Sequence, residues 1–468
     1  MTLRLRDTLS GETRPLEPLE PGHVRIYSCG PTVYGPAHIG NFRSFLFADL
    51  LVRYLRWRGL RVTWVMNVTD VDDKIIKGAT EAGVSIAELA DRWLDRFRVD
   101  ARALRMTEPD VLPRATEHID GMVRLIETLL EKGHAYRTED GSIFFSIQSW
   151  PAYGRLARLD PEQLRVGERV EADEYGKSDV RDFALWKAAK PGEPAWETAL
   201  GAGRPGWHIE CSAMSTEYLG PSFDIHTGGV DLIFPHHEDE IAQTEAATGQ
   251  PFVRTWLHCD HLRLGGAKMA KSTGNISRVM DLLDEGVSPR ALRYALISVH
   301  YRQGLEYTPA SLTSAAAAIE RLDAVDLALD GYSEARADAP DLAAVLDAAR
   351  SAFEAALDDD LNVSAALAAL FDLVRELNRR IAERSLSTAD ASRALGLLRD
   401  LDRVLAILPD EVAELPEGAA ELLAGREAAR AARNWATSDR LRDELAALGV
   451  AVEDTRDGQR WRRLEPVS

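Results

Sequence analysis

The sequence predicts an α/β protein: a parallel-sheet domain split by an insertion, then an all-α helical bundle and a small α+β C-terminal domain. Two apolar strand-type segments, 24–27 and 62–66, flank a segment with helical spacing, and a second α/β region opens near Gly206. Beyond Pro309 the chain becomes rich in alanine and helical, and a compact tail follows a linker at 415–419. These observations together predict the order of the domains.

Length and composition limit the class of protein. At 468 residues the chain is too long for one core and is expected to form about two to four domains. Its 45% hydrophobic and 28% charged residues are typical of a soluble globular protein. No apolar run reaches about 18 residues, and the N-terminus lacks a signal pattern, so we expect a cytoplasmic protein with no membrane partner. Three cysteines, Cys29, Cys211 and Cys259, favour ligand, catalytic or packing roles over a disulfide framework.

Charge is distributed unevenly along the chain. The formal net charge of −19 does not suggest a nucleic-acid binder. From Glu421 onward, however, the nine Arg balance nine acidic residues, and such a region can still bind RNA locally. Only eight of the 56 basic residues are Lys, and none lies beyond Lys271.

The loop that follows the first strand is a candidate ligand site. Apolar residues from Phe42 to Leu55 recur at helical spacing, so the loop ends at a helix N-terminus, where α/β folds bind phosphates. His38 and Asn41 add side-chain donors there, and Gly40 removes a Cβ where a ligand could approach. An ordinary strand-to-helix turn explains this stretch equally well.

A polar cluster, residues 67–74, follows the second strand, at the edge where an open parallel sheet places its ligand contacts. For these carboxylates we favour helix capping, by Asp70 or Asp72, ahead of Ile75 and Ile76.

The remaining elements follow from periodicity and turn residues. We expect a hairpin-like lead-in up to Pro21, helical spacing from Ile86 to about Lys132 capped by Gly133, and a hairpin over 136–147 around Asp140-Gly141. An irregular insertion should continue to about Arg204. The bundle should break near Pro340, Ser385 and Pro409, and the tail should hold one helix over 428–448 and a hairpin over 450–463.

Metal-ligating residue types are concentrated in one region. Six of the eleven His and two of the three Cys lie between His208 and His261. His236 and Glu240 are four residues apart and share a helix face, and Cys211 and Cys29 could complete a tetrahedral set acceptable to zinc. Buried cysteines beside a capped helix are the alternative. A rival cluster, His258, Cys259 and His261, has ligands too close in sequence for most closed zinc sites.

Lys268 and Lys271 lie in a loop with glycine on both sides, so their ammonium groups can approach a polyphosphate. A solvated lysine loop is the alternative, but it explains poorly why Lys occurs here in a chain dominated by Arg.

These motifs resemble those of the class I aminoacyl-tRNA synthetases. His38-Ile39-Gly40-Asn41 is similar to their His-Ile-Gly-His signature, and Lys268-Met269-Ala270-Lys271-Ser272 is similar to Lys-Met-Ser-Lys-Ser. Blocks typical of the cysteinyl-tRNA synthetases resemble residues 29–34, 69–74, 207–212 and 234–238. The likeness spans nearly the whole chain, including the tail from Arg426 to Trp461.

The resemblance implies a reaction and a set of site residues. The reaction is activation of L-cysteine with ATP to cysteinyl-adenylate and pyrophosphate, followed by transfer of cysteine to the 3′ end of its tRNA. One Zn²⁺ per chain would be held by Cys29, Cys211, His236 and Glu240 and would select the substrate thiol. The other roles implied are ATP binding with Mg²⁺ by His38, Gly40, Asn41, Gly229, Asp231 and Lys271, a substrate pocket at Thr69 and Trp207, and catalysis by His38, Asn41, Lys268 and Lys271.

The resemblance also implies a domain plan and a monomer. The plan is a Rossmann-like catalytic domain at 1–112 and 204–250, a connective insertion at 113–203, a stem-contact region at 251–308, a tRNA-binding bundle at 309–410 and an anticodon-binding domain at 420–468. Two residues depart from the family pattern, Ala270 in place of Ser and Thr227 in place of a frequent Gly, and they bear on loop dynamics and pocket shape.

Two alternative functions remain open on the sequence. One is a cysteine ligase of the same ancestry that forms an amide with an amino sugar, which would not need a tRNA-binding tail. The other is a synthetase-like binding protein that has lost activity, which would be expected to lack phosphate-binding or metal residues.

Overall fold

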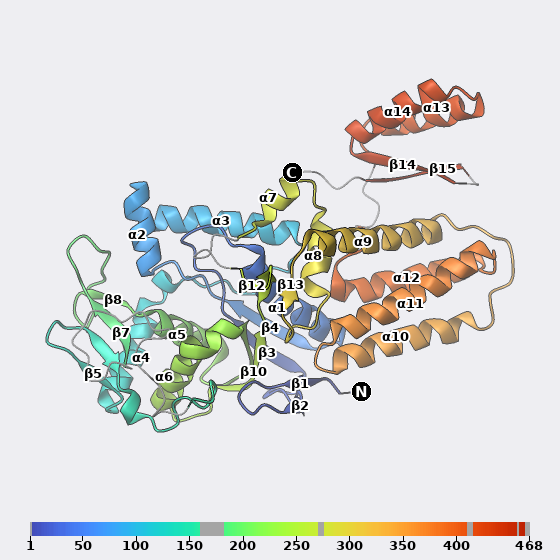
Figure 1. The fold of residues 1–468 in the computed structure, drawn as a ribbon. Helices are drawn as coiled ribbons and strands as arrows, with labels where there is room; N and C mark the ends of the chain where they lie inside the picture. The colour runs from blue at the N-terminus through green and yellow to red at the C-terminus, as the bar shows by residue number, and fades with distance from the viewer. Residues whose placement is uncertain (1, 160–181, 270–275, 410–414, 456–457, 464–468) are drawn as a thin grey trace.

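A four-stranded parallel sheet forms the centre of the computed structural model, which describes residues 2–159, 182–269, 276–409, 415–455 and 458–463 (Figure 1). The strand order is β10-β9-β3-β4. Strands β3 and β9 pair directly, with Ile26 opposite Ile225, although nearly 200 residues separate them. The predicted split parallel sheet is therefore confirmed. Its strands are β3 (His23–Ser28), β4 (Arg61–Met66), β9 (Phe223–Gly229) and β10 (Val253–Cys259).

Helices connect these strands and cover the sheet. Helix α1 (Ile39–Trp57) joins β3 to β4, as predicted, and Gly59 follows it with a φ of 80°. Helix α5 (Trp207–Leu219) precedes β9, and α6 (Glu238–Thr248) leads from β9 to β10. Between β9 and α6 lie a short 3₁₀ turn, η3 (Val230–Leu232), and a π-type turn, η4 (Ile233–His237).

The predicted helical stretch from Ile86 to Lys132 is wrong as one unit. It contains α3 (Ile86–Ala103) and α4 (Ile119–Glu131), separated by an extended segment that pairs with the end of β4 and by the 3₁₀ turn η1 (Ala115–Glu117). Pro109 and Pro113 fall in this gap, and proline cannot continue a helix. Ahead of α3, Asp72 caps α2 (Asp73–Ala82) as predicted, accepting from the Lys74 N–H at 2.8 Å.

The insertion is more regular than predicted. The expected hairpin is confirmed as β5 (Ala135–Arg137) and β6 (Ile143–Phe145), and Gly141 in the turn has a φ of 92°. The irregular stretch expected up to Arg204 instead contains β7 (Phe183–Ala188) and β8 (Gly203–Pro205), which complete an antiparallel sheet. Strand β7 was not predicted, because its first four residues are all apolar and buried and do not alternate with polar residues.

Short elements follow the central sheet. Strands β11 (Leu262–Leu264), β12 (Ala267–Lys268) and β13 (Leu305–Glu306) form a small sheet, and α7 (Val279–Asp284) and α8 (Pro289–Ile297) lie between β12 and β13 in the chain. At the N-terminus, β1 (Arg4–Arg6) and β2 (Thr13–Pro15) form the predicted hairpin, and η2 (Ile147–Ser149) follows β6.

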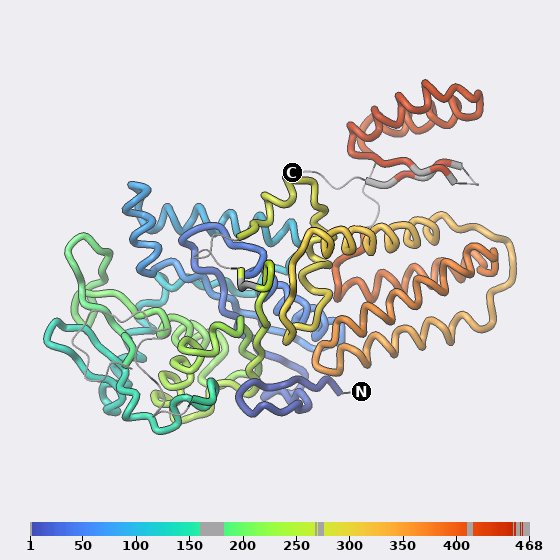
Figure 2. Tube along the Cα trace, in the orientation of Figure 1, coloured from blue at the N-terminus to red at the C-terminus, as the bar shows by residue number. Residues whose placement is uncertain are grey.

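The predicted helical bundle is confirmed as α9 (Pro309–Asp330), α10 (Leu342–Asp358), α11 (Val363–Ala382) and α12 (Thr388–Leu405) (Figure 2). The breaks near Pro340 and Ser385 occur where expected. A further break at Asp360 and Leu361 was not predicted, because neither is Gly or Pro, yet both have positive φ, 56° and 53°. The Asp360 carboxylate stabilises this turn, accepting from the Arg6 N–H at 2.8 Å and the Tyr301 hydroxyl at 2.7 Å.

The C-terminal tail is a separate small α+β unit (Figure 1). Its predicted single helix is wrong: α13 (Ala419–Ala431) and α14 (Trp435–Ala447) are divided at Arg433, which has a φ of 55°. Asn434 caps α14, accepting from the Thr437 N–H at 3.2 Å. The predicted hairpin is present as β14 (Val450–Thr455) and β15 (Gly458–Arg463). Among the described residues, no helix combines the length and apolar character needed to span a bilayer.

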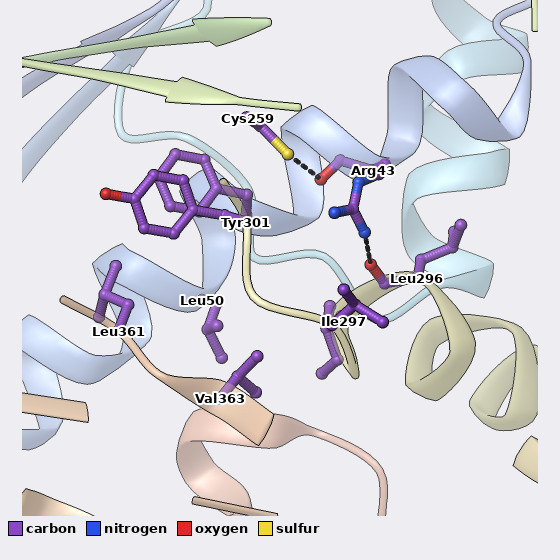
Figure 3. Close-up of a pocket in the computed structure, with 10 residues that line it drawn as sticks. Arg43, Leu50, Cys259, Leu296, Ile297, Tyr301, Leu361 and Val363 are labelled. Carbon is purple, nitrogen blue, oxygen red and sulfur yellow. Dashed lines mark hydrogen bonds between the residues drawn. The ribbon is translucent and has the colours of Figure 1, made fainter. Parts of the chain in front are cut away.

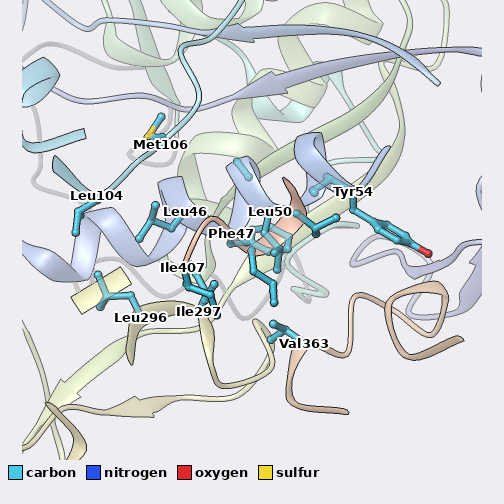
Figure 4. Packing of buried hydrophobic residues seen from close by; sticks show 14 of the residues in the cluster. Leu46, Phe47, Leu50, Tyr54, Leu104, Met106, Leu296, Ile297, Val363 and Ile407 are labelled. Atoms are coloured by element: carbon cyan, nitrogen blue, oxygen red, sulfur yellow. The ribbon is translucent and has the colours of Figure 1, made fainter. Parts of the chain in front are cut away.

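Helix α1 is shared between the sheet domain and the bundle. Figure 4 shows its apolar side chains, among them Leu46, Phe47 and Leu50, packed beside Leu296, Val363 and Ile407. In the same region the fully buried Arg293 pairs with the fully buried Asp49 at 2.6 Å and donates to the Leu104 and Leu405 carbonyls. One guanidinium thus joins α1, α8, the end of α3 and the end of α12.

We predict that Asp49→Asn lowers the free energy of unfolding by about 3–5 kcal/mol, because breaking a buried pair leaves a buried charge uncompensated. Urea titration followed by tryptophan fluorescence measures the change. The matched control is Arg375→Ala, which breaks an exposed pair with Asp372 on α11 and should have little effect. Equal effects of the two substitutions would contradict this role for Asp49.

Candidate active site

A cleft of about 710 Å³ opens at the carboxyl ends of the central strands. This is the edge where parallel α/β sheets bind their ligands. Cys29 follows β3, Asn67 and Thr69 follow β4, Asp231 follows β9, and Asp260 follows β10. The predicted site residues that line the cleft are Cys29, His38, Gly40, Asn41, Thr69, Trp207, Cys211, Gly229, Asp231 and His236.

The first turn of α1 forms one wall of the cleft. His38 is the N-cap: its Nδ1 accepts from the Asn41 N–H at 3.2 Å, and the Asn41 Oδ1 accepts from the His38 N–H at 3.1 Å. A Cβ on Gly40 would lie 2.9 Å from His38 Nδ1, so only glycine leaves room for this ring position. His38 and Asn41 thus cap the N-terminus of α1 reciprocally, as a capping box.

Both ends of the lysine loop lie beside this turn. Met269 is buried, lines the cleft and donates its N–H to the Leu262 carbonyl at 3.1 Å. After the loop, the Ser277 carbonyl accepts from the Ile39 N–H at 3.0 Å, and the backbone of Arg278 forms an isolated antiparallel β-bridge with that of His38. Lys268 lies in β12, whereas Ala270 and Lys271 lie outside the described residues.

Four potential metal ligands converge on the inner wall of the cleft. Ligand atoms of Cys29, Cys211, His236 and Glu240 all lie within 4.8 Å of one another. His236 Nε2 is 3.0 Å from Glu240 Oε1, and Cys29 Sγ is 3.9 Å from the same oxygen. The structure therefore brings together the four residues named from the sequence.

A second group shares two of these residues. Cys29 and Glu240 also lie close to His226 and His237: His237 Nε2 is 3.2 Å from Cys29 Sγ, and His226 Nε2 is 2.9 Å from Glu240 Oε2. Neither of these histidines is among the described residues that line the cleft, whereas Cys211 and His236 are. The first group therefore has three residues in the lining of the cleft, whereas the second group has one, Cys29.

The electrostatics of the first group favour a cation. Burial would raise the pKa of Cys211, but its hydrogen bond with Cys29 and the charge of His236 lower that pKa to about 6. Burial would raise the pKa of Glu240, but His226 and His236 lower it to about 2. The pKa of His236 is raised to about 10 by Glu240 and Cys211 against the effect of burial. Without a metal, a proton on His236 thus offsets a buried thiolate and carboxylate, and a cation can take over that role.

The donor chemistry fits zinc. Two sulfurs, one imidazole and one carboxylate are all acceptable zinc ligands, and three of the four residues face the cleft, as a site that also binds a substrate atom requires. Burial raises the pKa of Cys29 well above its usual value, so this thiol would lose its proton on binding a metal.

The surrounding groups are kept largely neutral by burial. Burial lowers the pKa of His208 and of His237 well below the usual value, and that of His258 to about 3. Burial also raises the pKa of Asp239 well above its usual value, against the hydrogen bond from Tyr153.

The rival cluster at His258, Cys259 and His261 does not form among the described residues. Adjacent residues of a strand point to opposite faces, so His258 contacts His237 at 2.8 Å while Cys259 turns toward the Arg43 carbonyl (Figure 3). That side holds a small apolar cavity beneath α1, with Tyr301 and Leu296 in its lining. Cys259 is therefore a packing residue.

The substrate-pocket residues are held by neighbouring side chains. Trp207 stacks on the His236 ring with centroids 4.2 Å apart, and Thr69 accepts from the Asn67 amide at 3.2 Å. Thr227, which departs from the family pattern, bonds the Ser28 hydroxyl at 2.7 Å. The hydroxyl of Thr227, which glycine would lack, thus has a hydrogen-bond partner in Ser28.

Trp93 and Phe97 of α3 line the cleft but had no functional signal in the sequence. Lys74 and Tyr34, which lie in the motif blocks 69–74 and 29–34, form a cation–π contact at 5.7 Å at the cleft. The helical pattern marks Trp93 and Phe97 only as apolar positions. Their exposure to the cleft depends on how α3 packs across the sheet.

Family models match most of the chain. The model for the class I (C) tRNA synthetase catalytic domain matches residues 15–317, the DALR domain model matches 352–409, and the cysteinyl-tRNA ligase anticodon-binding domain model matches 412–462.

Similar proteins agree with these matches. The cysteine–tRNA ligase of Alkalilimnicola ehrlichii is 48% identical over 98% of this chain and 100% of its own length, and that of Symbiobacterium thermophilum is 46% identical over 99% and 100%. A methionyl-tRNA synthetase structure from Mycobacterium tuberculosis, in complex with methionyl-adenylate, shares the fold with a TM-score of 0.58 and 18% identity, over 82% of this chain and 90% of that one. The chain therefore belongs to the cysteine–tRNA ligase family of class I aminoacyl-tRNA synthetases.

Proposed function

We propose that the protein activates L-cysteine with ATP and transfers the cysteinyl group to the 3′ end of the tRNA for cysteine. The observation that carries this proposal is the group of Cys29, Cys211, His236 and Glu240 in the same cleft as the N-terminus of α1. A ligand set suited to a thiol-binding metal and a helix end suited to phosphate thus face one cavity. Family membership supports the same reaction.

In this proposal the four ligands hold one zinc ion. When bound, zinc would supply a Lewis acid that binds the substrate sulfur as a thiolate, whereas the hydroxyl of serine is a far poorer ligand. Apolar contacts alone discriminate such similar substrates by only about 10- to 200-fold, so a metal-based choice would make an editing site unnecessary. Trp207, stacked on His236, would line the pocket for the substrate side chain together with Thr69.

The nucleotide would occupy the other end of the cleft. His38, Gly40 and Asn41 would contact the phosphates of the magnesium-bound ATP, and Gly229 with Asp231 would contact the adenosine. A Cβ on Gly229 would lie 2.5 Å from Asp231 Oδ1, so the absence of a side chain at Gly229 leaves that carboxylate its position. Lys268 and Lys271 would stabilise charge on the departing pyrophosphate.

The chemistry requires positioning and no protein nucleophile. The cysteine carboxylate attacks the α-phosphorus, an O–P bond forms, and the bond to pyrophosphate breaks. A hydroxyl of the terminal ribose then attacks the adenylate carbonyl, and AMP leaves. The carboxylate and the ribose are brought together by the cleft, while the helix end and the lysines stabilise the charge that develops.

The C-terminal parts would bind the tRNA. We assign catalysis to 1–112 with 204–250, a connective role to 113–203, contact with the tRNA stem to 251–308, and tRNA binding to 309–410 and the anticodon domain at 420–468. Helix α1 packs on both the sheet and the bundle, so tRNA bound along the bundle would be held in a fixed relation to the cleft.

The proposed function predicts cysteine-dependent exchange of pyrophosphate with ATP, and charging of a transcript of the cysteine tRNA. Serine in place of cysteine should give almost no exchange. Exchange without charging would favour a cysteine ligase that uses another amine acceptor. Absence of exchange in zinc-loaded protein would reject the enzyme function.

We predict that Cys211→Ser reduces bound zinc from one per chain to a small fraction and raises the KM for cysteine, because a thiolate ligand is lost. Metal analysis by mass spectrometry and exchange kinetics measure both effects. Cys259→Ser is the matched control, since Cys259 contacts Arg43 and Asp260 instead of the metal group, and it should retain the zinc. Full zinc occupancy in Cys211→Ser would contradict the proposed ligand set.

We predict that Lys271→Ala slows adenylate formation by about 100- to 1,000-fold, the scale for losing one preorganised electrostatic contact to a transition state. The affinity for cysteine should change little. Single-turnover formation of the adenylate and equilibrium binding of cysteine separate the two. Lys77→Ala, at an exposed lysine of α2, is the matched control. Equal losses in rate and affinity would count against the proposed role.

A further inference from the structure

The segment that carries Cys29 stays paired with its neighbour after both have left the central sheet. The Thr69 N–H donates to the Pro31 carbonyl at 3.1 Å, and the Thr69 carbonyl accepts from the Val33 N–H at 3.1 Å. Thr32 and Thr69 form an isolated parallel β-bridge. The segments that follow β3 and β4 are therefore joined along the wall of the cleft.

The side chain of Asn67 makes one hydrogen bond to each of these two segments. Asn67 follows β4 directly, lines the cleft and is 2% exposed. Its Oδ1 accepts from the Gly30 N–H at 2.9 Å, and its Nδ2 donates to Thr69 Oγ1 at 3.2 Å. One amide group thus contacts the neighbour of the proposed metal ligand Cys29 and a residue of the proposed substrate pocket.

The direction of both bonds is fixed. A backbone N–H can only donate, so the amide oxygen of Asn67, and not its nitrogen, must face Gly30. The NH₂ group then faces Thr69, whose hydroxyl oxygen must accept and whose own hydrogen points away from Asn67. An amide and an alcohol do not titrate in water, so this assignment holds whatever the pH.

Cys29 is held from both of the strands that flank β3. Its N–H donates to the Thr227 carbonyl of β9 at 3.2 Å. On the other side, Gly30 packs so closely on the backbone of Asn67 that a Cβ on Gly30 would clash with the Asn67 carbonyl oxygen. The bond from the Gly30 N–H to Asn67 Oδ1 fixes this close approach.

Cys29 is the proposed ligand that most needs such support. Cys211, His236 and Glu240 come from the second half of the sheet domain and are buried, whereas Cys29 alone comes from the first half and is only partly buried. A tetrahedral zinc site tolerates little error in the position of each ligand. The loop after β3 must therefore be held at the correct distance from the other three residues.

We propose that Asn67 is a positioning residue that holds Cys29, through Gly30, and Thr69 in one fixed relation. Its oxygen serves the metal ligand, and its NH₂ group serves the substrate pocket. Groups outside the ligand set commonly orient the ligands of a metal in this way. The inference rests on the zinc site of the proposed function and extends it to a residue outside the four ligands.

The test of the Gly30 bond compares Asn67→Leu with Asn67→Asp. Aspartate keeps an oxygen for the Gly30 N–H, whereas leucine has a similar shape and makes neither bond. Zinc affinity is measured by competition with a chromophoric chelator, and the cobalt(II) protein gives the ligand-field spectrum of the site. We expect Asn67→Leu to weaken zinc binding by about 10-fold and to alter the cobalt spectrum. Asn67→Asp should retain the zinc affinity.

The bond to Thr69 is tested by the KM for cysteine in the exchange reaction at saturating zinc. Thr69→Val removes the acceptor and an ionised Asn67→Asp removes the donor, so each should raise KM by about 3- to 10-fold, the scale of one hydrogen bond. The double variant should raise KM little more than Thr69→Val alone. Thr128→Val, which removes an exposed hydroxyl on α4, is the matched control and should change neither measurement.

The outcomes separate this inference from the proposed function. Equal zinc affinity in Asn67→Leu and Asn67→Asp would overturn the role of the Gly30 bond, and additive effects on KM would overturn the route through Thr69. If circular dichroism shows that Asn67→Leu does not fold, Asn67→Ala takes its place, because alanine also makes neither bond. A complete, unmodified chain that binds no zinc would instead reject the metal site itself.

Discussion

The parallel pairing of β3 with β9 is the contact on which the site depends. It places Ile26 beside Ile225 and so aligns two halves of a sheet that the insertion separates in the chain. Cys29, directly after β3, then meets Cys211 at the start of α5 and His236 after β9. A shift in this register would move Cys29 away from the other three ligands. The metal group is thus a consequence of sheet topology and not of any local motif.

Burial of charge is the second constraint on the molecule. Cys211, His236 and Glu240 are almost completely inaccessible to water, and an isolated ionised group in such a place is strongly disfavoured. The structure surrounds them with histidines, His208, His226 and His237, each of which contacts a different proposed ligand. His208 thus contacts the second ring nitrogen of His236, and His226 contacts the second carboxylate oxygen of Glu240.

Helix α1 relates the cleft to the rest of the chain. Its first turn holds the reciprocal cap of His38 and Asn41, and one turn later Arg43 donates to the carbonyls of Asp260, Leu296 and Gln303. Farther along, Asp49 pairs with Arg293 beside the bundle. The same helix therefore faces the end of the cleft proposed for the nucleotide, the strands next to the lysine loop, and the helices proposed to bind tRNA. These contacts hold the cleft, the strands and the bundle in fixed positions relative to one another.

The sequence by itself determined the split sheet, the bundle and the small C-terminal unit, because strand runs and helical spacing are local patterns. It also named the four proposed metal ligands from their residue types, the His236 and Glu240 interval and the family motifs, although their meeting in space depends on the pairing of β3 with β9. It missed β7, whose buried run has no alternation, and the left-handed turns at Asp360 and Arg433, where no glycine marks the position. Only the tertiary structure decided that His258 and Cys259 point apart, that Trp93 lines the cleft, and that Asn67 joins Gly30 to Thr69. These facts depend on which distant segments pack together, whereas the periodicity of the sequence indicates only whether a residue is buried or exposed.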